Sequence, residues 1–159
     1  MRILRNTPEF KPSEVVVAEE VIDGYLKDPL SSGYYILVAE LDSVAGYICY
    51  GPTPLTEGTW DLYWMAVAPD KQRQGIGGAL MKSAEKEIMR AKGRLVIIET
   101  SSTPAYEKTK RFHTSHGYEI IARLPDFYAL GDDKLILQKR LGQNQREDSH
   151  PQKDDSHNA

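Results

Sequence analysis

Apolar and polar positions along this chain form short runs that are typical of β-strands. Strand-like runs cover residues 34–39, 44–50, 59–67, 95–98, 118–124 and 134–139, and 1–5 can add a short first strand. The first two runs flank a turn at Asp42 and Ser43, so they predict an antiparallel hairpin. The last two predict a second antiparallel pair, joined by a loop over 125–133.

Helical spacing of apolar residues appears in three stretches between these strands. The first begins near Ser13, a good N-cap residue, and should end between Gly24 and Pro29. The second opens at residues 75–78 and should have Gly93 as the residue just after its end. The third covers 103–116. The chain therefore predicts an α/β fold with helices packed on a sheet.

The run at 59–67, the helix after it and the run at 95–98 should form one β-α-β unit. The continuous apolar run at 95–98 is typical of a strand covered on both faces, and a helical crossover joins parallel strands. Alternation should place Asp61, Tyr63 and Met65 on one face of their strand and Leu62, Trp64 and Ala66 on the other. The predicted sheet is mostly antiparallel with this one parallel pair.

Length and composition fit one domain. The chain has 159 residues, 40% hydrophobic and 27% charged, with a net charge of −3. Residues 142–159 hold two basic and four acidic residues and almost no apolar ones, so we expect a disordered polar tail after a domain at 1–141. The rest of the chain has a charge of only −1. Nucleic acid and anionic membranes are therefore not expected partners.

Cys49 is the single cysteine, which excludes an intrachain disulfide and a cysteine-based metal cluster. It lies within a predicted strand, so a buried, unreactive thiol is the expected state and a reactive one the alternative. We expect no metal site. The sequence has neither a signal-peptide profile nor an apolar run long enough to cross a bilayer, which predicts a cytoplasmic protein.

A glycine-bearing turn between the strand at 59–67 and its helix is the most informative motif. Such a turn directs backbone N–H groups at a bound anion. A Walker loop is excluded because Gly77 is followed by Gly78 and Ala79, and a dinucleotide fingerprint fails because its third glycine would fall on Leu80. The pattern Q/R-x-x-G-x-G/A is met without substitution by Gln72-Arg73-Gln74-Gly75-Ile76-Gly77.

In this context the hexapeptide resembles the acetyl-CoA site of the GNAT superfamily of acyl-CoA-dependent N-acetyltransferases. The segment R-F-H-T-S-H-G-Y at 111–118 resembles the family's second signature, F/L-Y-x-x-x-G-F/Y. The resemblance covers about residues 2–141. It implies the GNAT fold, in which the two parallel strands splay apart and helices cover both faces of the sheet.

The resemblance also implies how the chain binds acetyl-CoA as a cosubstrate. The pyrophosphate would lie on the turn and first helical residues, and the pantetheine arm along the end of the preceding strand. The implied phosphate residues are Gln72, Arg73, Gln74, Gly75, Ile76, Gly77, Gly78 and Ala79, and the implied arm residues are Met65, Ala66 and Val67. The same likeness suggests the Val67 N–H as the donor to the thioester oxygen.

Catalysis would need a base for the amine and an acid for the departing thiolate. Asp61 matches the place of the glutamate base of the superfamily's histone acetyltransferases; binding the acceptor's ammonium or fixing a loop are alternatives. His113 takes the place of the usual tyrosine acid, and an ordinary pKa near ~6.5 would suit that role. A solvated histidine is the alternative, with the role passing to Tyr106 or to water.

We therefore expect an N-acetyltransferase that moves acetyl to a primary amine of a small molecule or peptide by direct attack in a ternary complex. The loops at 50–57 and 126–134 are expected to face this acceptor. A homodimer is possible. The alternative function is a non-catalytic acyl-CoA sensor, which the missing tyrosine favours.

Overall fold

The computed structural model describes residues 12–29 and 31–142, with side chains from residue 20 onward. The predicted strand at 1–5 and, apart from Gly142, the predicted tail at 142–159 lie outside the described residues. The described elements are α2 (Pro12–Lys27), β1 (Tyr35–Glu40), β2 (Val44–Pro52), β3 (Thr59–Val67), η1 (Pro69–Lys71), α3 (Ile76–Arg90), β4 (Leu95–Ser101), η2 (Pro104–Tyr106), α4 (Glu107–Ser115), β5 (Glu119–Ala129) and β6 (Asp132–Arg140).

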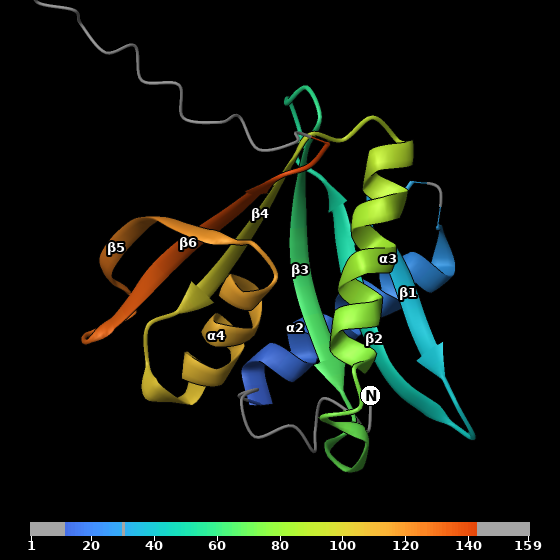
Figure 1. Ribbon diagram of the computed structural model, residues 1–159, viewed down its shortest axis with the longest axis horizontal. Coiled ribbons are helices and arrows are strands. Elements are labelled where there is room, and N and C mark those ends of the chain that lie inside the picture. The colour runs from blue at the N-terminus through green and yellow to red at the C-terminus, as the bar shows by residue number, and fades with distance from the viewer. Residues whose placement is uncertain (1–11, 30, 143–159) are drawn as a thin grey trace, which may run out of the picture.

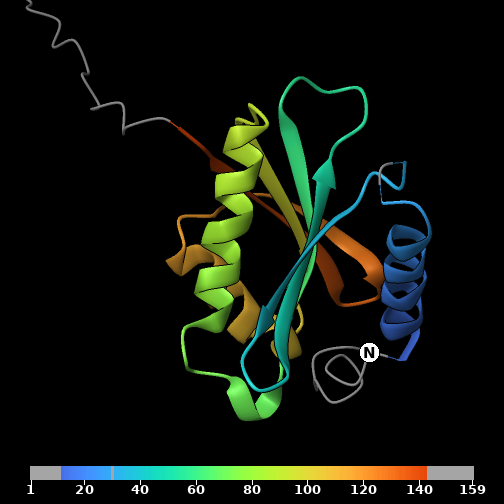
Figure 2. The same cartoon turned by 90° about the vertical axis from the view of Figure 1, so that its right-hand side faces the viewer.

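The strands form one six-stranded sheet in the order β1-β2-β3-β4-β6-β5 (Figure 1). Among the described strands, only β3 and β4 pair in parallel, and the other neighbouring pairs are antiparallel. Figure 2 shows α3 on one face of the sheet and α2 on the other. The predicted mixed sheet with one parallel pair and helices on both faces is therefore confirmed.

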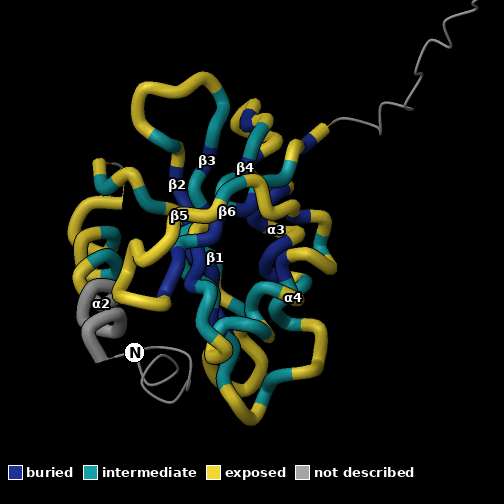
Figure 3. The backbone as a smooth tube through the Cα atoms, turned by 90° about the vertical axis from the view of Figure 1, so that its left-hand side faces the viewer, coloured by how far each residue is buried: buried dark blue, intermediate teal, exposed yellow. Residues whose placement is uncertain are grey.

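Successive residues of β2 supply the two hydrophobic cores on opposite faces of the sheet. Ile48 and Tyr50 belong to the larger core, which includes the α3 residues Met81 and Ile88. Tyr47 and Cys49 belong to the smaller core, against which apolar residues of α2 pack. Figure 3 shows this burial concentrated in the central strands, whereas the loops are exposed. The sheet thus holds its central strands rigidly for the site described below.

A β-bulge in β3 changes the predicted alternation of its side chains. Cys49 pairs with Trp64 and Tyr50 with Leu62, so Tyr63 is an extra residue on β3. After the bulge, Met65 packs against the same core as Leu62, and Tyr63 and Trp64 both pack against the smaller core. The prediction that Tyr63 and Met65 share a face is wrong, because a bulge reverses the alternation and bends the strand.

The bulge coincides with the point where β3 leaves β4. The two strands pair from Thr59–Leu95 to Leu62–Ile98 and no further, although β3 continues to Val67 and β4 to Ser101. The strand ends therefore diverge, as Figure 1 shows, and open the sheet at its centre. This is the splayed parallel pair that the resemblance implies.

The predicted loop at 125–133 is largely strand. β5 continues to Ala129, and a short turn at Leu130 and Gly131 leads into β6. Asp126, with a φ of 52°, forms the irregularity that accommodates Pro125 in this edge strand. The carboxylate of Asp126 accepts the N–H of Gly131, which closes the hairpin.

The residue after α3 differs from the predicted one, whereas α2 ends where predicted. Lys92, rather than Gly93, has the left-handed φ of 61° after α3. Gly93 is instead required by packing, since a Cβ there would lie 2.2 Å from Ile88 Cγ2. Helix α2 ends at Lys27, within the predicted interval between Gly24 and Pro29. No helix among the described residues is long and apolar enough to cross a membrane. A cytoplasmic location stays a prediction.

Candidate active site

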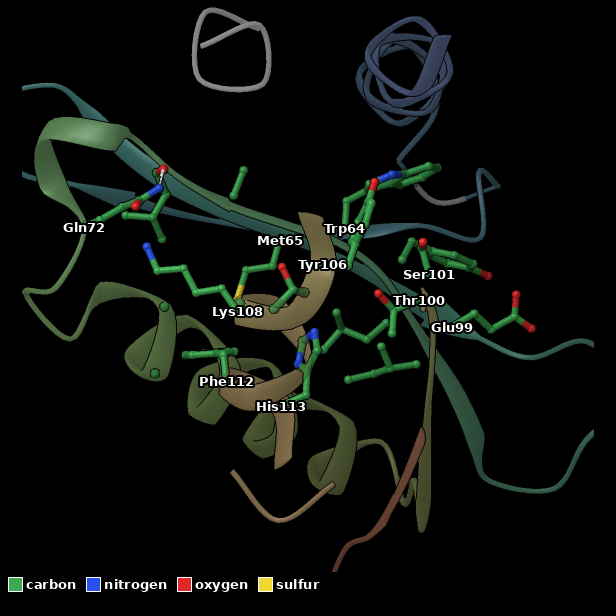
Figure 4. A pocket seen from close by; sticks show the side chains of 18 of the residues that line it. Trp64, Met65, Gln72, Glu99, Thr100, Ser101, Tyr106, Lys108, Phe112 and His113 are labelled. Carbon is green, nitrogen blue, oxygen red and sulfur yellow. Dashed lines mark hydrogen bonds between the residues drawn. The ribbon is translucent and has the colours of Figure 1, made fainter. Parts of the chain in front are cut away.

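A cavity of about 940 Å³ occupies the gap between the diverging strands and continues to the first turn of α3. Figure 4 shows Gln72 at one end of it and Glu99 and Ser101 at the other, with Met65 and His113 between them. All three catalytic candidates line it: Asp61, Tyr106 and His113. So do nine of the binding candidates: Met65, Ala66, Val67, Gln72, Arg73, Gly75, Ile76, Gly77 and Gly78. Gln74 and Ala79 do not.

The edge of β3 presents backbone groups to this cavity. Ala68 donates its N–H to Ala45 O at 2.7 Å, so by antiparallel alternation Ala66 bonds to β2 and the backbones of Met65 and Val67 face away from it. Gln72 Nε2 donates to Val67 O at 3.3 Å, in agreement with that orientation. Among the described residues, β4 does not pair with this stretch of β3. An extended ligand can therefore pair here as an added strand.

The turn before α3 combines two left-handed residues with a free helix N-terminus. Arg73 has a φ of 65° and Gly75 a φ of 77°, and a Cβ at Gly75 would meet nothing within 4 Å. The first N–H groups of α3 have no partner within the helix, and no acidic residue lies in its first turn. Both features favour a bound anion.

Gly77 and Gly78 serve mainly to pack α3 against α4. A Cβ on Gly77 would lie 3.3 Å from the Phe112 ring, and one on Gly78 would lie 3.1 Å from His116 Nε2. The ring centroids of Phe112 and His116 lie 4.3 Å apart, with the ring planes tilted by 38°. The second glycine of the motif, Gly77, therefore allows α3 and α4, which both line the cavity, to pack closely. The motif alone does not indicate this packing role.

Asp61 lies where β3 and β4 still pair, opposite Ile97. Its carboxylate accepts a 2.7 Å hydrogen bond from Thr53 Oγ1, which orients it. Thr53 lies in the segment 50–57 that was expected to be a loop facing the acceptor; residues 50–52 of this segment belong to β2. No residue of that loop lines the cavity, so it contributes only through Asp61.

His113 is a buried part of the cavity wall, not a solvated helix residue. The side chain is 4% exposed, and its Nδ1 has no hydrogen-bond partner in the part of the chain that the structure describes. Burial, with a smaller effect of nearby His116, lowers the pKa of His113 to about 4. The expectation of an ordinary pKa near 6.5 is therefore wrong, and His113 is a neutral imidazole at neutral pH. A polar ligand that reaches Nδ1 would satisfy this buried atom.

Several lining residues were missed from the sequence. Lys108 extends from α4 toward Gln72, as Figure 4 shows, and Phe112 packs beside His113 on the same helix. Thr100 and Ser101 lie at the end of β4. In the sequence these residues were indicated only by where they stand. The strand ends next to the diverging pair and one face of α4 must border the gap.

A hydrogen-bonded group closes the end of the cavity opposite the turn. Ser101 Oγ donates to Asp132 Oδ1 and accepts the backbone N–H of Thr103 at 3.1 Å. Asp132 lines the cavity although only 5% of it is exposed, and Tyr128 of β5 lines it nearby. Both lie in the segment 126–134 that was expected to face the acceptor. Among the described residues, no group of three His, Cys, Asp or Glu side chains could hold a metal ion.

A family model described as an acetyltransferase (GNAT) domain matches residues 32–120, from before β1 to the start of β5. The chain belongs to the GNAT family of acetyltransferases. The match includes β3, the turn, α3 and α4, which together line most of the cavity. The chain is thus an acyltransferase, as predicted.

Solved structures agree with this assignment. A GNAT-family protein from Desulfovibrio desulfuricans has 43% sequence identity and a TM-score of 0.84, with 87% of this chain and 88% of that chain covered.

More distant structures share the fold and contain the cofactor. An aminoglycoside 6'-N-acetyltransferase complexed with coenzyme A has 21% identity and a TM-score of 0.68, covering 91% of this chain and 89% of that one. A Salmonella typhimurium protein solved with its cofactor acetyl-CoA has 23% identity and a TM-score of 0.64, covering 83% and 78%. A search of curated proteins finds no match.

Proposed function

We propose that this GNAT protein transfers an acetyl group from acetyl-CoA to a primary amine by direct attack in a ternary complex. The observation that carries the proposal is the continuous cavity from the turn of α3, along the unpaired edge of β3, to the carboxylates at its far side. It offers an anion site, a strand-pairing edge and candidate proton acceptors in one line.

The turn would hold the pyrophosphate. The backbone N–H groups of residues 75–78 and the positive end of α3 would be its donors, with Gly75 leaving room for a close approach. The N–H of Ala79 is already bonded to Gly75 O at 3.0 Å within the helix. Arg73 and Lys108 would add positive charge. Lys71 also lines this end, 3.5 Å from Asp42.

The edge of β3 would pair with the pantetheine arm through Met65 and Val67, with Ala66 between them. Bound acetyl-CoA supplies the thioester: a C–N bond to the amine forms and the C–S bond breaks. The Val67 N–H is directed away from β2 and can donate to the thioester oxygen. Because this N–H is already oriented, it would polarise the thioester carbonyl without a rearrangement of the protein.

Asp61 would accept the proton that the amine loses. Its short side chain suits transfer through one water molecule, and Thr53 keeps the carboxylate directed. Burial raises the pKa of Tyr63 to about 12, and the nearby Asp61 carboxylate adds to this rise. The Tyr63 phenol therefore stays protonated. Asp61 is therefore the better proton acceptor of the two.

His113 would take the place of the family's tyrosine at the sulfur. Because it is neutral, it cannot act as a stored imidazolium, and we assign it a hydrogen bond to the departing sulfur through a ring N–H. The proton that finally neutralises the thiolate is the one released by the amine. Tyr106, on the same wall, is the second candidate donor.

The chain offers no support for a covalent acetyl-enzyme through its cysteine. Cys49 is buried outside the cavity, and burial raises the pKa of its thiol to about 12. Its thiolate is therefore not available at neutral pH.

Thiol release measured over a panel of amines tests the proposal. We expect coenzyme A to appear at a rate that depends on the amine, with acetylated product in equal amount. Acetyl-CoA binding by calorimetry without release for any amine would instead indicate the sensor.

A further inference from the structure

The cavity passes through the sheet, so residues on both faces line it. On the face of α3, Met65 and Phe112 line it and pack against the larger core. Tyr63 and Trp64 also line it, yet both pack against the smaller core, on the face of α2. Figure 4 shows Trp64 on the side of the strands where α2 lies, away from Phe112. The α2 side of the gap is therefore a second position for a ligand, opposite the proposed cofactor site.

Asp61, the proposed proton acceptor, belongs to the same face as these two aromatic residues. Trp60 and Leu62 on either side of it pack in the larger core, so Asp61 is directed to the α2 face. Its partner on β2 is Gly51, and a Cβ there would lie 3.3 Å from Tyr63 Cε2. The Tyr63 ring thus lies beside the position opposite Asp61. An amine that reaches Asp61 from this face passes next to the ring.

The two aromatic side chains are held in place by ring contacts. Tyr34 contacts Tyr63 edge-on with ring centroids 5.4 Å apart, and the ring centroids of Tyr63 and Trp64 lie 6.1 Å apart. The bulge causes this arrangement, because it places two consecutive residues of β3 on one face. Both side chains are only partly buried, so each keeps accessible surface at the cavity. Such rings bind a flat group at little cost in side-chain entropy.

A carboxylate beside two rings suits one class of amine. Asp61 attracts the amino group, which arrives protonated, and the rings follow it along the strand. Residues two apart on a strand are roughly 6.5 Å apart, a separation that a two-carbon linker with its ring can span. Aromatic rings pack favourably against another ring in offset or edge-to-face contact. The α2 side of the cavity therefore fits an amine that carries a ring of its own.

We propose that Tyr63 and Trp64 select acceptors in which a short alkyl linker joins the primary amine to an aromatic ring. The ring packs against the two side chains while the amino group reaches Asp61. The acceptor class is therefore an arylalkylamine. This specificity rests on the proposed acetyl transfer in the same cavity. Neither aromatic side chain has a role in the chemical step, so both act through acceptor binding.

Calorimetry on the full chain saturated with coenzyme A tests the selection without turnover. The probes are phenylethylamine and cyclohexylethylamine, which share the linker and the amine. The cyclohexyl ring is the more hydrophobic, so desolvation alone favours it. We expect the wild type to bind the phenyl compound about three- to tenfold more tightly, the usual effect of a contact between rings.

Variants assign this preference to the two side chains. Tyr63→Leu and Trp64→Leu should each reduce it, and the double variant should abolish it. The matched control is Tyr35→Leu, which removes an exposed aromatic residue of the sheet outside the cavity lining and should retain the preference.

The same two amines in the thiol-release assay separate this inference from the proposed function. Equal binding of the two amines to the wild type, tighter binding of the cyclohexyl compound, or a preference that survives in the double variant would overturn selection by the rings, whatever the turnover. A preference for the phenyl compound that depends on both rings, without release of coenzyme A, would support the selection and contradict the proposed transfer. If a variant does not fold, the wild-type ratio is the deciding measurement.

Discussion

The two walls of the cavity contribute different kinds of groups. The wall formed by β3, the turn and α3 offers mainly backbone N–H and C=O groups, arranged by the bulge at Tyr63 and by Gly75. The wall formed by β4, α4 and β6 offers side chains: His113, Ser101 and Asp132. The first wall suits a ligand that is the same throughout a family, whereas the second can be specific to one chain.

This difference determines how each wall responds to substitution. Backbone groups keep their directions when most side chains change, so cofactor binding on the first wall should fail only where φ or strand pairing is altered. Among the groups of the chemical step, Asp61 is the exception on that wall, because its side chain is the proposed proton acceptor. On the second wall a single side chain carries the chemistry. The predictions below test this distinction.

Asp61→Asn should give the largest loss, because it removes the proposed proton acceptor while keeping the hydrogen bond from Thr53. We expect kcat to fall about 100-fold or more, the usual range for general base catalysis. Steady-state kinetics with saturating acetyl-CoA would measure it. Thr53→Val keeps the Asp61 carboxylate but removes its hydrogen-bond donor, so kcat should fall much less. Equal rates for Asp61→Asn and wild type would assign the proton to another group.

His113→Phe should lower turnover more than cofactor affinity. We expect a fall in kcat of about 10- to 100-fold with nearly unchanged KM for acetyl-CoA, since the imidazole is assigned to the departing sulfur. His116→Phe is the matched control, because His116 directly follows the same helix as its C-cap residue and lies outside the cavity lining. An unchanged kcat would exclude His113 from the mechanism.

The neutral state of His113 also predicts a pH dependence of stability. The unfolded chain binds a proton near pH 6.5, whereas the folded protein does so only near 4. Relative to His113→Phe, the wild type should therefore lose about 1.4 kcal/mol of unfolding free energy per pH unit as the pH falls through this window. Urea unfolding of both proteins across the window measures the difference. Parallel pH profiles would contradict the lowered pKa.

Two glycine substitutions on the first wall should have smaller effects. Gly75→Ala forces a side chain into a left-handed conformation, which costs about 1–2 kcal/mol and should weaken coenzyme A binding about tenfold or distort the turn. A Cβ at Gly77 would meet the Phe112 ring at 3.3 Å and Val67 Cγ2 at 3.8 Å, both side-chain contacts, so calorimetry should show a smaller loss for Gly77→Ala. A larger loss at Gly77 would mean that contact between the walls matters more than the turn conformation.

The first wall was largely predictable from the sequence. The boundaries of β3 and the opening of α3 follow from local patterns, namely an apolar alternation and a glycine turn. The bulge at Tyr63 was not predictable, because it depends on pairing with β2. Local sequence does not encode that register.

The second wall was predictable only in part. His113 could be located from the motif, but its burial depends on how α4 packs beside Tyr118, 5.9 Å away between ring centroids. Its lowered pKa follows from that packing. Asp132 belonged to a segment expected near the acceptor, yet its bond to Ser101 joins residues 31 positions apart. Such contacts require the tertiary structure.

A single-turnover experiment with the protein in excess over acetyl-CoA tests direct transfer across this cavity. The acetyl group should remain on coenzyme A until an amine is added and then appear on the amine, with the protein mass unchanged throughout. An acetylated protein, or acetyl-CoA that stays intact with every amine, would contradict direct transfer.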